Sequence, residues 1–266
     1  MRMSPASRLP QPVSLRGIIA TLATVAAAAA HAQDLPQGWS GKGQAGYVMS
    51  RGNSEADSAN VKIDVDLRRN DWKHALTLQG LFGRSAGITS SERWDARLQS
   101  DYTINTHVFA FGALAYQNDR FSGFQYQESA TGGIGYKFLD SDTTKLSAQV
   151  GVGYRSLRPE LLVKGADGAV IARIPQGIRS EAVGTAGVDF SHRFNTSTRI
   201  LDKMIIESGS SNTSIRNDLA LEVKMSKKLS LAAGFSVLKN TNPPNGLKQT
   251  DTVTTLNLVY AFPEPK

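Results

Sequence analysis

The 266-residue sequence contains no cysteine, which excludes disulfide bonds and a lipid anchor on a cysteine at the processed N-terminus. Stability must therefore come from strand pairing and burial. The sequence also lacks a run of about 20 apolar residues, the length that a membrane-spanning helix requires. If this chain crosses a membrane, it must do so as a closed β-barrel, because lipid offers no partners to unpaired backbone groups.

The N-terminal segment has the three parts of a secretory signal peptide. A basic start is followed by an apolar run from Gly17 to Ala30 and by Ala30-His31-Ala32, a small-x-small sequence typical of a cleavage site. A single anchoring helix is the alternative, but the apolar run is too short for it. We predict a signal peptide over residues 1–32, cleavage before Gln33 and one outer-membrane barrel domain over residues 33–266.

The charge balance indicates no particular partner. The chain has 30 Lys and Arg against 23 Asp and Glu, and the predicted signal peptide contains Arg2, Arg8 and Arg16. The mature part therefore has a net charge of 27 minus 23, or +4. So small an excess does not favour nucleic-acid binding.

The stretch from Thr250 to Phe262 alternates strictly near its end. Large apolar side chains stand at every second position from Leu256 to Phe262, with Asn257, Val259 and Ala261 between them. Period-two order places one face against an apolar medium. A soluble sandwich also shows this order, but a chain end that rises to Tyr-x-Phe is typical of the closing strand of an outer-membrane barrel, which must pair with the first strand.

Similar alternation recurs in segments of about 9 to 14 residues separated by turn signals. We predict an all-β fold, an antiparallel transmembrane β-barrel of about twelve strands, with a soluble lipocalin-like barrel as the alternative. The facing of Val108 to Tyr116 stays open, because both of its parities are apolar. The strands are predicted to begin near Lys42, Asp57, Trp72, Glu92, His107, Gln125, Thr144, Arg179, Thr198, Thr213, Leu229 and Thr250.

The connections and the aromatic residues favour the membrane barrel. Connections after even-numbered strands are short and those after odd-numbered strands are longer, as periplasmic turns and external loops are. The longer set includes Ser85–Ser91, Asp119–Phe124, Ser156–Ile178 and Thr241–Gln249. Outward aromatics form two predicted girdles. The outer girdle holds Tyr47, Phe82, Trp94, Tyr116, Tyr126 and Tyr154, and the inner one holds Trp72, Tyr102, Phe138, Phe190, Phe194 and Phe262.

Several short motifs resemble those of the YdiY-like, salt-induced outer-membrane proteins, a family of unknown function. They include Gly52-Asn53-Ser54, Trp72-Lys73-His74, Ser100-Asp101-Tyr102, Asp119-Arg120-Phe121-Ser122-Gly123 and the LNLVYAF end. The resemblance covers nearly the whole mature chain, and it implies an outer-membrane barrel with a role in envelope stress. The tail Pro263–Lys266 and an insert around Leu161–Ile174 depart from the family pattern.

No set of residues predicts catalysis, a cofactor or a metal ion. His74, His107 and His192 fall at the predicted inner interface, and Ser191 and His192 point to opposite faces, so they cannot pair within one strand. The run Gly132–Gly135 lies in a strand pattern and is expected to relieve crowding. We therefore predict a non-enzyme, with an outer-leaflet hydrolase as the least favoured alternative.

The inward faces of the strands carry charges of both signs. Twelve strands give a backbone radius of about 12 Å, so these side chains either stiffen the barrel as a salt-bridge lattice or line a narrow polar pore for ions and small solutes. A structural barrel is favoured over the pore. The predicted inward residues are Lys62, Asp64, Asp66, Arg68, Arg93, Asp95, Arg97, Asp101, Glu181, Asp189, Arg193, Arg216, Asp218, Glu222 and Lys224.

Expected partners are outer-membrane lipid, lipopolysaccharide phosphates and the barrel-insertion machinery, which would meet the C-terminal strand. Basic residues of the external loops would bind the phosphates: Arg51, Arg84, Arg120, Arg158, Lys164, Arg173, Arg179, Lys239 and Lys248. Within the insert, Gly165–Gly168 predicts a hairpin that projects beyond the outer girdle. Its apolar residues Leu162, Val170 and Ile171 need a covering surface, either the barrel mouth or a partner, and the hypothesis is a lid over the mouth.

Overall fold

The computed structural model describes residues 38–51, 56–85, 88–120, 122–166, 170–244 and 247–262. The predicted signal peptide, the motif Gly52-Asn53-Ser54, the hairpin tip at 167–169 and the tail 263–266 lie outside the described residues. In the part of the chain that is described, no helix is long and apolar enough to cross a membrane.

Thirteen strands make up the described chain, most of them 12 to 17 residues long. They are β1 (Trp39–Arg51), β2 (Ala56–Arg69), β3 (Trp72–Ser85), β4 (Ile88–Thr103), β5 (Val108–Asp119), β6 (Phe124–Asp140), β7 (Thr144–Lys164), β8 (Val170–Pro175), β9 (Arg179–Arg193), β10 (Thr198–Gly209), β11 (Thr213–Lys224), β12 (Leu229–Asn240) and β13 (Thr250–Phe262).

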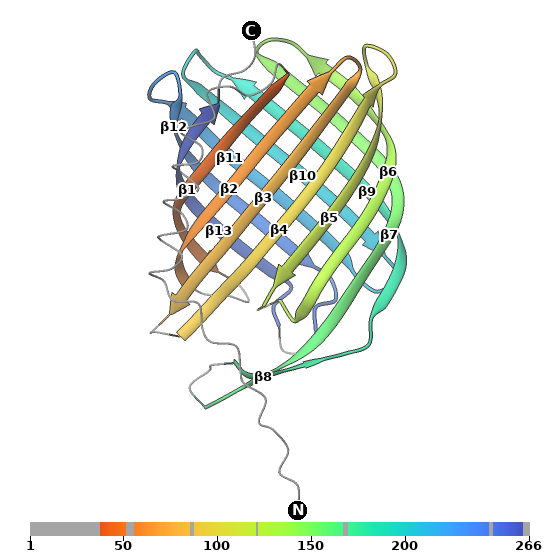
Figure 1. Cartoon of the computed structure of the whole chain (residues 1–266), viewed down its shortest axis with the longest axis vertical. Helices are drawn as coiled ribbons and strands as arrows, with labels where there is room; N and C mark the ends of the chain where they lie inside the picture. The colour runs from red at the N-terminus through yellow and green to blue at the C-terminus, as the bar shows by residue number, and fades with distance from the viewer. Residues whose placement is uncertain are drawn as a thin grey trace, which may run out of the picture. The chain divides into compact units, whose positions relative to one another are not determined.

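Twelve of these strands close into a single antiparallel ring. Each pairs with its sequence neighbour, β7 pairs with β9, and β13 closes on β1 from Gly41↔Phe262 to Arg51↔Thr252. β8 stands outside the ring, because it pairs only with the far end of β7. Figure 1 shows β1 to β5 as the near wall, tilted against β9 to β12 of the far wall. The predicted count and the closing role of the last strand are confirmed.

One end of the barrel, called the turn end, holds the connections 70–71, 104–107, 141–143, 194–197 and 225–228 together with Trp39 and Phe262. Side chains build these tight turns. Asn105 Oδ1 accepts hydrogen bonds from the backbone N–H groups of His107 and Val108, and Asn195 Oδ1 accepts from the same two relative positions. Such Asx turns explain why short polar signals sufficed to predict this end.

The opposite end, called the loop end, differs from the prediction. The expected loop over Ser85–Ser91 is mostly strand, since β3 runs to Ser85 and the ladder continues to Ser85↔Ile88 after a register shift at Gly83/Arg84. Residues 210–212 also form a short connection. The difference in length between the two ends therefore rests on the β12–β13 connection, residues 241–249, and on the β7–β8 insert.

The barrel has its large apolar side chains outside. In β13, Leu256 and Leu258 are about half exposed, whereas the alternating residues Asn257 and Val259 are buried in the lumen. Val152 of β7 is 74% exposed. An exposed apolar wall around a polar interior is typical of transmembrane barrels and disfavours the soluble lipocalin-like alternative.

Aromatic side chains gather at both ends of this wall. At the loop end Trp94 stacks on Tyr116 with ring centroids 4.8 Å apart. At the turn end the centroids of Trp72 and Tyr102 are 5.0 Å apart, and Tyr260 meets Phe262 at 5.6 Å. The two predicted girdles are present in the described residues, although the side chain of Tyr47 lies outside them. Tyr136 and Tyr260 also belong to the turn-end girdle, and the prediction missed both.

The insert forms the predicted hairpin. The end of β7 pairs with β8 from Glu160↔Pro175 to Lys164↔Val170, and Figure 1 shows this hairpin continuing beyond the rim of the barrel. Its base is tied to the barrel because Glu160 N donates to Gly123 O at 2.8 Å.

The hairpin does not bury its apolar residues as expected. Leu162 and Val170 are half-buried, but Ile171 is 63% exposed. Within the described residues the barrel mouth therefore does not cover Ile171, and cover by a partner stays a prediction. The hairpin alone does not seal the mouth.

Candidate functional site: the lumen

The inward polar side chains form a lattice of hydrogen bonds and ion pairs. Arg93 Nε and Gln79 Nε2 both donate to Asp95 Oδ2, at 2.9 and 2.7 Å. On the neighbouring strands Thr77 Oγ1 donates to Asp64 Oδ1 at 2.8 Å. The strict alternation of β2 and β4 brings these groups to one face, so the predicted salt-bridge lattice is present.

Not every predicted inward charge joins the lattice. Arg68, Arg193 and Lys224 are exposed at the turn end, and in the described part of the chain none of them contacts a carboxylate. Because this end is open to solvent, the three charges are hydrated there rather than paired.

Other contacts join non-adjacent strands through the lumen. Arg216 Nη2 of β11 lies 3.7 Å from Asp95 Oδ1 of β4, and these strands are six steps apart in either direction around the ring. Gln99 Nε2 of β4 donates to Gln149 Oε1 of β7 at 3.1 Å. Nearer the turn end, Lys42 Nζ of β1 lies 3.4 Å from Glu222 Oε2 of β11. Side chains of non-adjacent strands therefore meet at several heights.

Glu222 has a second basic partner. Arg199 Nη2 on the adjacent strand β10 donates to both of its carboxylate oxygens, at 2.8 and 2.7 Å. A carboxylate held by a guanidinium on one side and an ammonium from across the lumen is well fixed in place. This cluster anchors the turn half of the ionic lattice.

A second buried cluster, called the Arg155 cluster, lies in the loop half. It consists of Arg155 on β7, Glu181 on β9 and the 210–212 connection. The Arg155 side chain is 2% exposed, and its Nη2 donates to Glu181 Oε1 at 2.5 Å and to Asn212 O at 2.6 Å. Glu181 also accepts bonds from Ser210 Oγ and from Ser211 N and Oγ. The pair thus ties β7 and β9 to the connection between β10 and β11.

A cavity of about 110 Å³ lies beside this cluster in the middle of the barrel. Charged and amide side chains from both walls reach it. Its polar lining includes Asp95, Arg97, Gln117, Arg155, Glu207 and Arg216.

On the β5–β7 side, the turn half of the same lumen holds apolar groups, called the Phe–Gly cluster: Phe109, Phe111, Gly133, Gly135 and Gly151. Phe109 and Phe111 face inward and are buried. A Cβ atom on Gly135 would lie 2.1 Å from Phe109 Cζ, and one on Gly151 would lie 3.0 Å from Phe111 Cζ. The glycines therefore make room for the rings, as predicted for the glycine run. This packing also settles the facing of β5, which the sequence left open.

The loop end is closed by a contact between two connections on opposite sides of the ring. Gly123, in the β5–β6 connection, has a φ of +76°, and a Cβ atom there would lie 2.6 Å from Leu247 Cδ1 and 2.8 Å from Pro244 Cγ. Leu247 and Pro244 belong to the β12–β13 connection. This contact therefore bridges the mouth, which the hairpin was expected to cover.

The prediction missed several inward residues. Arg155 follows Gly153 by two positions, so continuing the alternation of β7 by one more step would have found it. On β10 the alternation is mixed, because Leu201 and Ile205 face inward beside Arg199 and Lys203. Lys203 pairs with Asp189 at 3.5 Å. The missed inward charges are Lys42, Arg155, Arg199, Lys203 and Glu207.

The histidines lie on the outer wall and pair with hydroxyls across strands. His74 Nδ1 is 2.8 Å from Ser100 Oγ, and His192 Nδ1 is 2.8 Å from Thr144 Oγ1. Sequence reasoning missed both pairs because their members are far apart in the chain. In the described residues no carboxylate contacts either imidazole, so neither pair has the third group that orients a catalytic base. Trp72 stacks on His74, consistent with an interfacial role.

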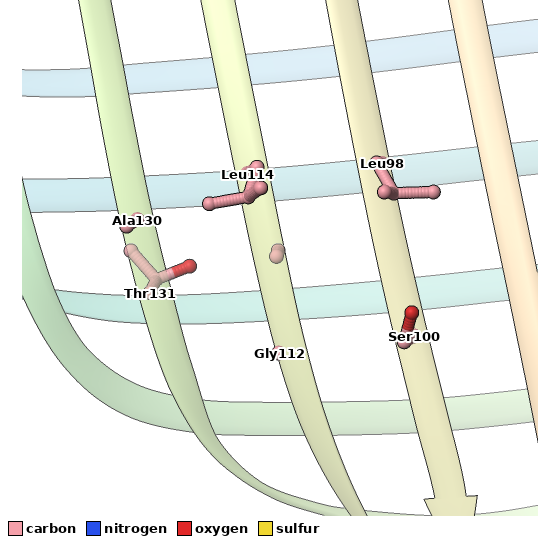
Figure 2. A pocket seen from close by; sticks show the side chains of 7 residues that line it. Leu98, Ser100, Gly112, Leu114, Ala130 and Thr131 are labelled. Atoms are coloured by element: carbon pink, nitrogen blue, oxygen red, sulfur yellow. The ribbon is translucent and has the colours of Figure 1, made fainter.

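A shallow groove of about 440 Å³ lies on the outer wall over β4 to β6 (Figure 2). It exists because Gly112 has no side chain, and no heavy atom lies within 4 Å of the position of a Cβ there. Leu98 and Leu114 flank it, and Ser100 lies beside it. The groove is apolar and continuous with the exposed wall.

Within the described residues, no group of three or more His, Asp or Glu side chains is placed to hold a metal ion. Some of the basic residues of the loop end are already neutralised. Arg120 lies 2.7 Å from Glu92, and Arg173 lies 2.8 Å from Glu160. These two arginines are therefore less available to anions than the sequence suggested.

Comparison with solved structures places the fold among outer-membrane barrels. The NanC porin has a TM-score of 0.51 at 8% sequence identity, with 82% of this chain and 98% of NanC covered. The translocator domain of the autotransporter NalP from Neisseria meningitidis has a TM-score of 0.50 at 12% identity, with 92% and 96% covered. At these identities the likeness shows the fold alone.

Comparison with known sequences identifies the family. The protein YdiY of Escherichia coli K12, which is uncharacterized, is 24% identical over 224 residues, or 82% of this chain and 81% of YdiY. The family model described as "Protein of unknown function, DUF481" matches residues 43–262. The resemblance to YdiY-like proteins is confirmed, and the chain belongs to the DUF481 family.

Proposed function

We propose that the protein is a non-catalytic outer-membrane barrel with a structural role under envelope stress, whose lumen is held closed by its own side chains. The observation that carries this proposal is the set of contacts that cross the lumen. Arg216 reaches Asp95, Gln99 reaches Gln149, and Lys42 reaches Glu222, so the barrel is braced at three heights.

The proposed location is supported by the exposed apolar wall, the two aromatic girdles and the likeness to NanC and NalP. In that setting the chain is exported with a cleaved signal peptide, and its C-terminal strand is the element that the insertion machinery meets. The turn end faces the periplasm, and the loop end faces lipopolysaccharide.

Bracing of the lumen also suits a stress role. A barrel that loses its interior contacts leaks solutes. Ion pairs that join non-adjacent strands preserve the cross-section of the barrel when the membrane is under strain. Salt screens exposed charges strongly and buried ones much less, and the pairs Lys42–Glu222 and Arg216–Asp95 are partly buried. The lattice therefore retains part of its strength at high ionic strength.

Conductance in planar lipid bilayers tests this proposal. We expect the refolded full barrel domain to show no discrete steps, and the double variant Gln99→Ala/Arg216→Ala to show small ones, because two of the three bracing contacts are removed. Leu258→Ala on the outer wall is the control and should stay silent. Regular steps from the wild-type protein would contradict a closed lumen.

A narrow passive channel for ions or small polar solutes is the second candidate. It is favoured by one observation: the groups that close the middle of the lumen are long side chains around a polar cavity of about 110 Å³. Arg216 and Asp95 are 3.7 Å apart, which is beyond hydrogen-bond length, so modest rotamer changes would separate them. NanC, which is similar in fold, is a porin.

The bilayer experiment also tests this second candidate. Ala115 faces the lumen, so conductance steps of the wild-type protein that Ala115→Trp blocks would establish the channel. Gly112 faces outward, so steps that also vanish when a bulky residue replaces Gly112 would be an artefact.

A further inference from the structure

Basic and acidic side chains both line the central cavity. Three guanidinium groups, from Arg97 on β4, Arg155 on β7 and Arg216 on β11, line it together with Gln117 on β5. The cavity is thus bordered by basic side chains from strands that are far apart in the ring.

These side chains keep donors that no other described residue uses. Arg155 Nε and Nη1, Arg97 Nε, Arg216 Nη2 and Gln117 Nε2 are all buried without a hydrogen-bond acceptor in the described residues. Arg155 is the clearest case, because its side chain is 2% exposed and only its Nη2 is bonded. A buried donor without an acceptor is costly, and one on a charged group more so.

The acidic groups nearby are already engaged. Asp95 accepts bonds from Arg93 and Gln79, and Glu207 accepts one from Ser129. Glu181, the partner of Arg155, accepts three further bonds from Ser210 and Ser211. Asp95 Oδ1 and Arg216 Nη2 have no hydrogen bond but lie 3.7 Å apart as an ion pair, so the donors left without a partner are those of Arg155, Arg97 and Gln117. Among the buried polar atoms of the lining, unpartnered donors therefore outnumber unpartnered acceptors.

We propose that the central cavity is a binding site for a small carboxylate of the size of acetate. A carboxylate brings two oxygens that match the donor geometry of guanidinium groups and accept several bonds at once. A cavity of about 110 Å³ holds a few water molecules or one such anion, not a sugar or a larger acid. The proposal goes beyond the structural role and does not depend on whether the barrel conducts.

Binding is measured directly, without a conductance readout. The full barrel domain is refolded in the presence of ¹³C-acetate so that entry does not limit occupancy, and the bound fraction is followed by NMR line broadening and by calorimetric titration. We expect saturable binding of one acetate per barrel. Arg97→Gln and Arg216→Gln should each weaken it about tenfold or more, because a charge-assisted hydrogen bond is lost.

Arg193→Gln is the matched control, since it removes the same charge from the exposed turn end and should leave the affinity unchanged. Heat-modifiable gel mobility shows which variants have folded. A size series on the wild-type protein keeps the test independent of the variants: acetate and formate should bind, and benzoate should not. Binding that is absent, equal in all three variants, or matched by chloride would overturn the assignment and leave a cavity filled by water alone.

Discussion

Two buried clusters sit at different heights inside this barrel, and both involve β7. The Phe–Gly cluster fills the turn half with Phe109 and Phe111 packed over glycines of β6 and β7. The Arg155 cluster fills part of the loop half with a buried ion pair and a short connection. The Phe–Gly cluster fills its part of the lumen with apolar side chains, and the Arg155 cluster fills its part with hydrogen-bonded charged side chains.

The difference shows how a twelve-stranded barrel fills a lumen that is wider than one side chain. Aromatic rings occupy volume fully when the neighbouring strands have no side chains there, so this cluster needs no further partner. Guanidinium groups reach farther but carry several donors, and Arg155 leaves two of them unused. The Phe–Gly cluster therefore leaves no polar group without a partner, whereas the Arg155 cluster leaves hydrogen-bond donors that a ligand can use. Three predictions probe this contrast.

The largest effect is expected from breaking the ion pair of the Arg155 cluster. Glu181→Ala leaves the Arg155 charge buried, and removal of one partner of a buried pair costs about 3–5 kcal/mol of unfolding free energy. Urea unfolding in lipid vesicles, followed by tryptophan fluorescence, measures this loss.

Glu92→Ala is the control for that experiment. It breaks the more exposed pair with Arg120, for which about 0–1 kcal/mol is expected. If both variants unfold at the same urea concentration, the Arg155 pair is not a structural brace. The double variant Arg155→Met/Glu181→Ala should regain part of the stability, because no charge is then left unpaired.

A smaller effect is expected from overfilling the Phe–Gly cluster. In Gly151→Ala the new Cβ atom would lie 2.3 Å from Gly132 O and 3.0 Å from Phe111 Cζ, so backbone must move, at a cost of about 1–3 kcal/mol. Gly112→Ala adds the same methyl group on the outer wall with no atom within 4 Å, and its unfolding free energy should hardly change. Equal destabilisation of the two variants would mean that the lumen is not tightly packed there.

The smallest effect is expected from deleting the hairpin, residues 161–174. An isolated two-stranded hairpin is marginally stable, and its apolar residues are largely exposed, so the unfolding free energy should change by less than about 1 kcal/mol. Conductance should also stay the same, because Gly123, Pro244 and Leu247 close the loop end. A clear rise in conductance or in protease cleavage of the barrel would restore the lid hypothesis.

The sequence predicted that several residues of the candidate site face the lumen, but not which of them contact one another. Alternation identified Asp95, Arg97 and Arg216 as inward residues, because period two is a local property of extended backbone. It did not show that Arg216 reaches Asp95 across the ring, since that contact depends on how far each strand is staggered when the barrel closes. Nor did it show that Arg155 is the most deeply buried of the charges, although its parity was readable.

The sequence by itself determined the fold class, most strand starts and the facing of the strands with one apolar face. Strands predicted to begin at Trp72, Thr144, Thr198 and Thr213 begin there, because turn residues and alternation are encoded within a few positions. Only the tertiary structure decided the facing of β5, where Phe109 and Phe111 compete with Leu114 for the apolar side. The glycines of β6 and β7 resolve that competition, because they leave space for large rings inside the barrel, and this complementarity exists only once β5, β6 and β7 have paired in register.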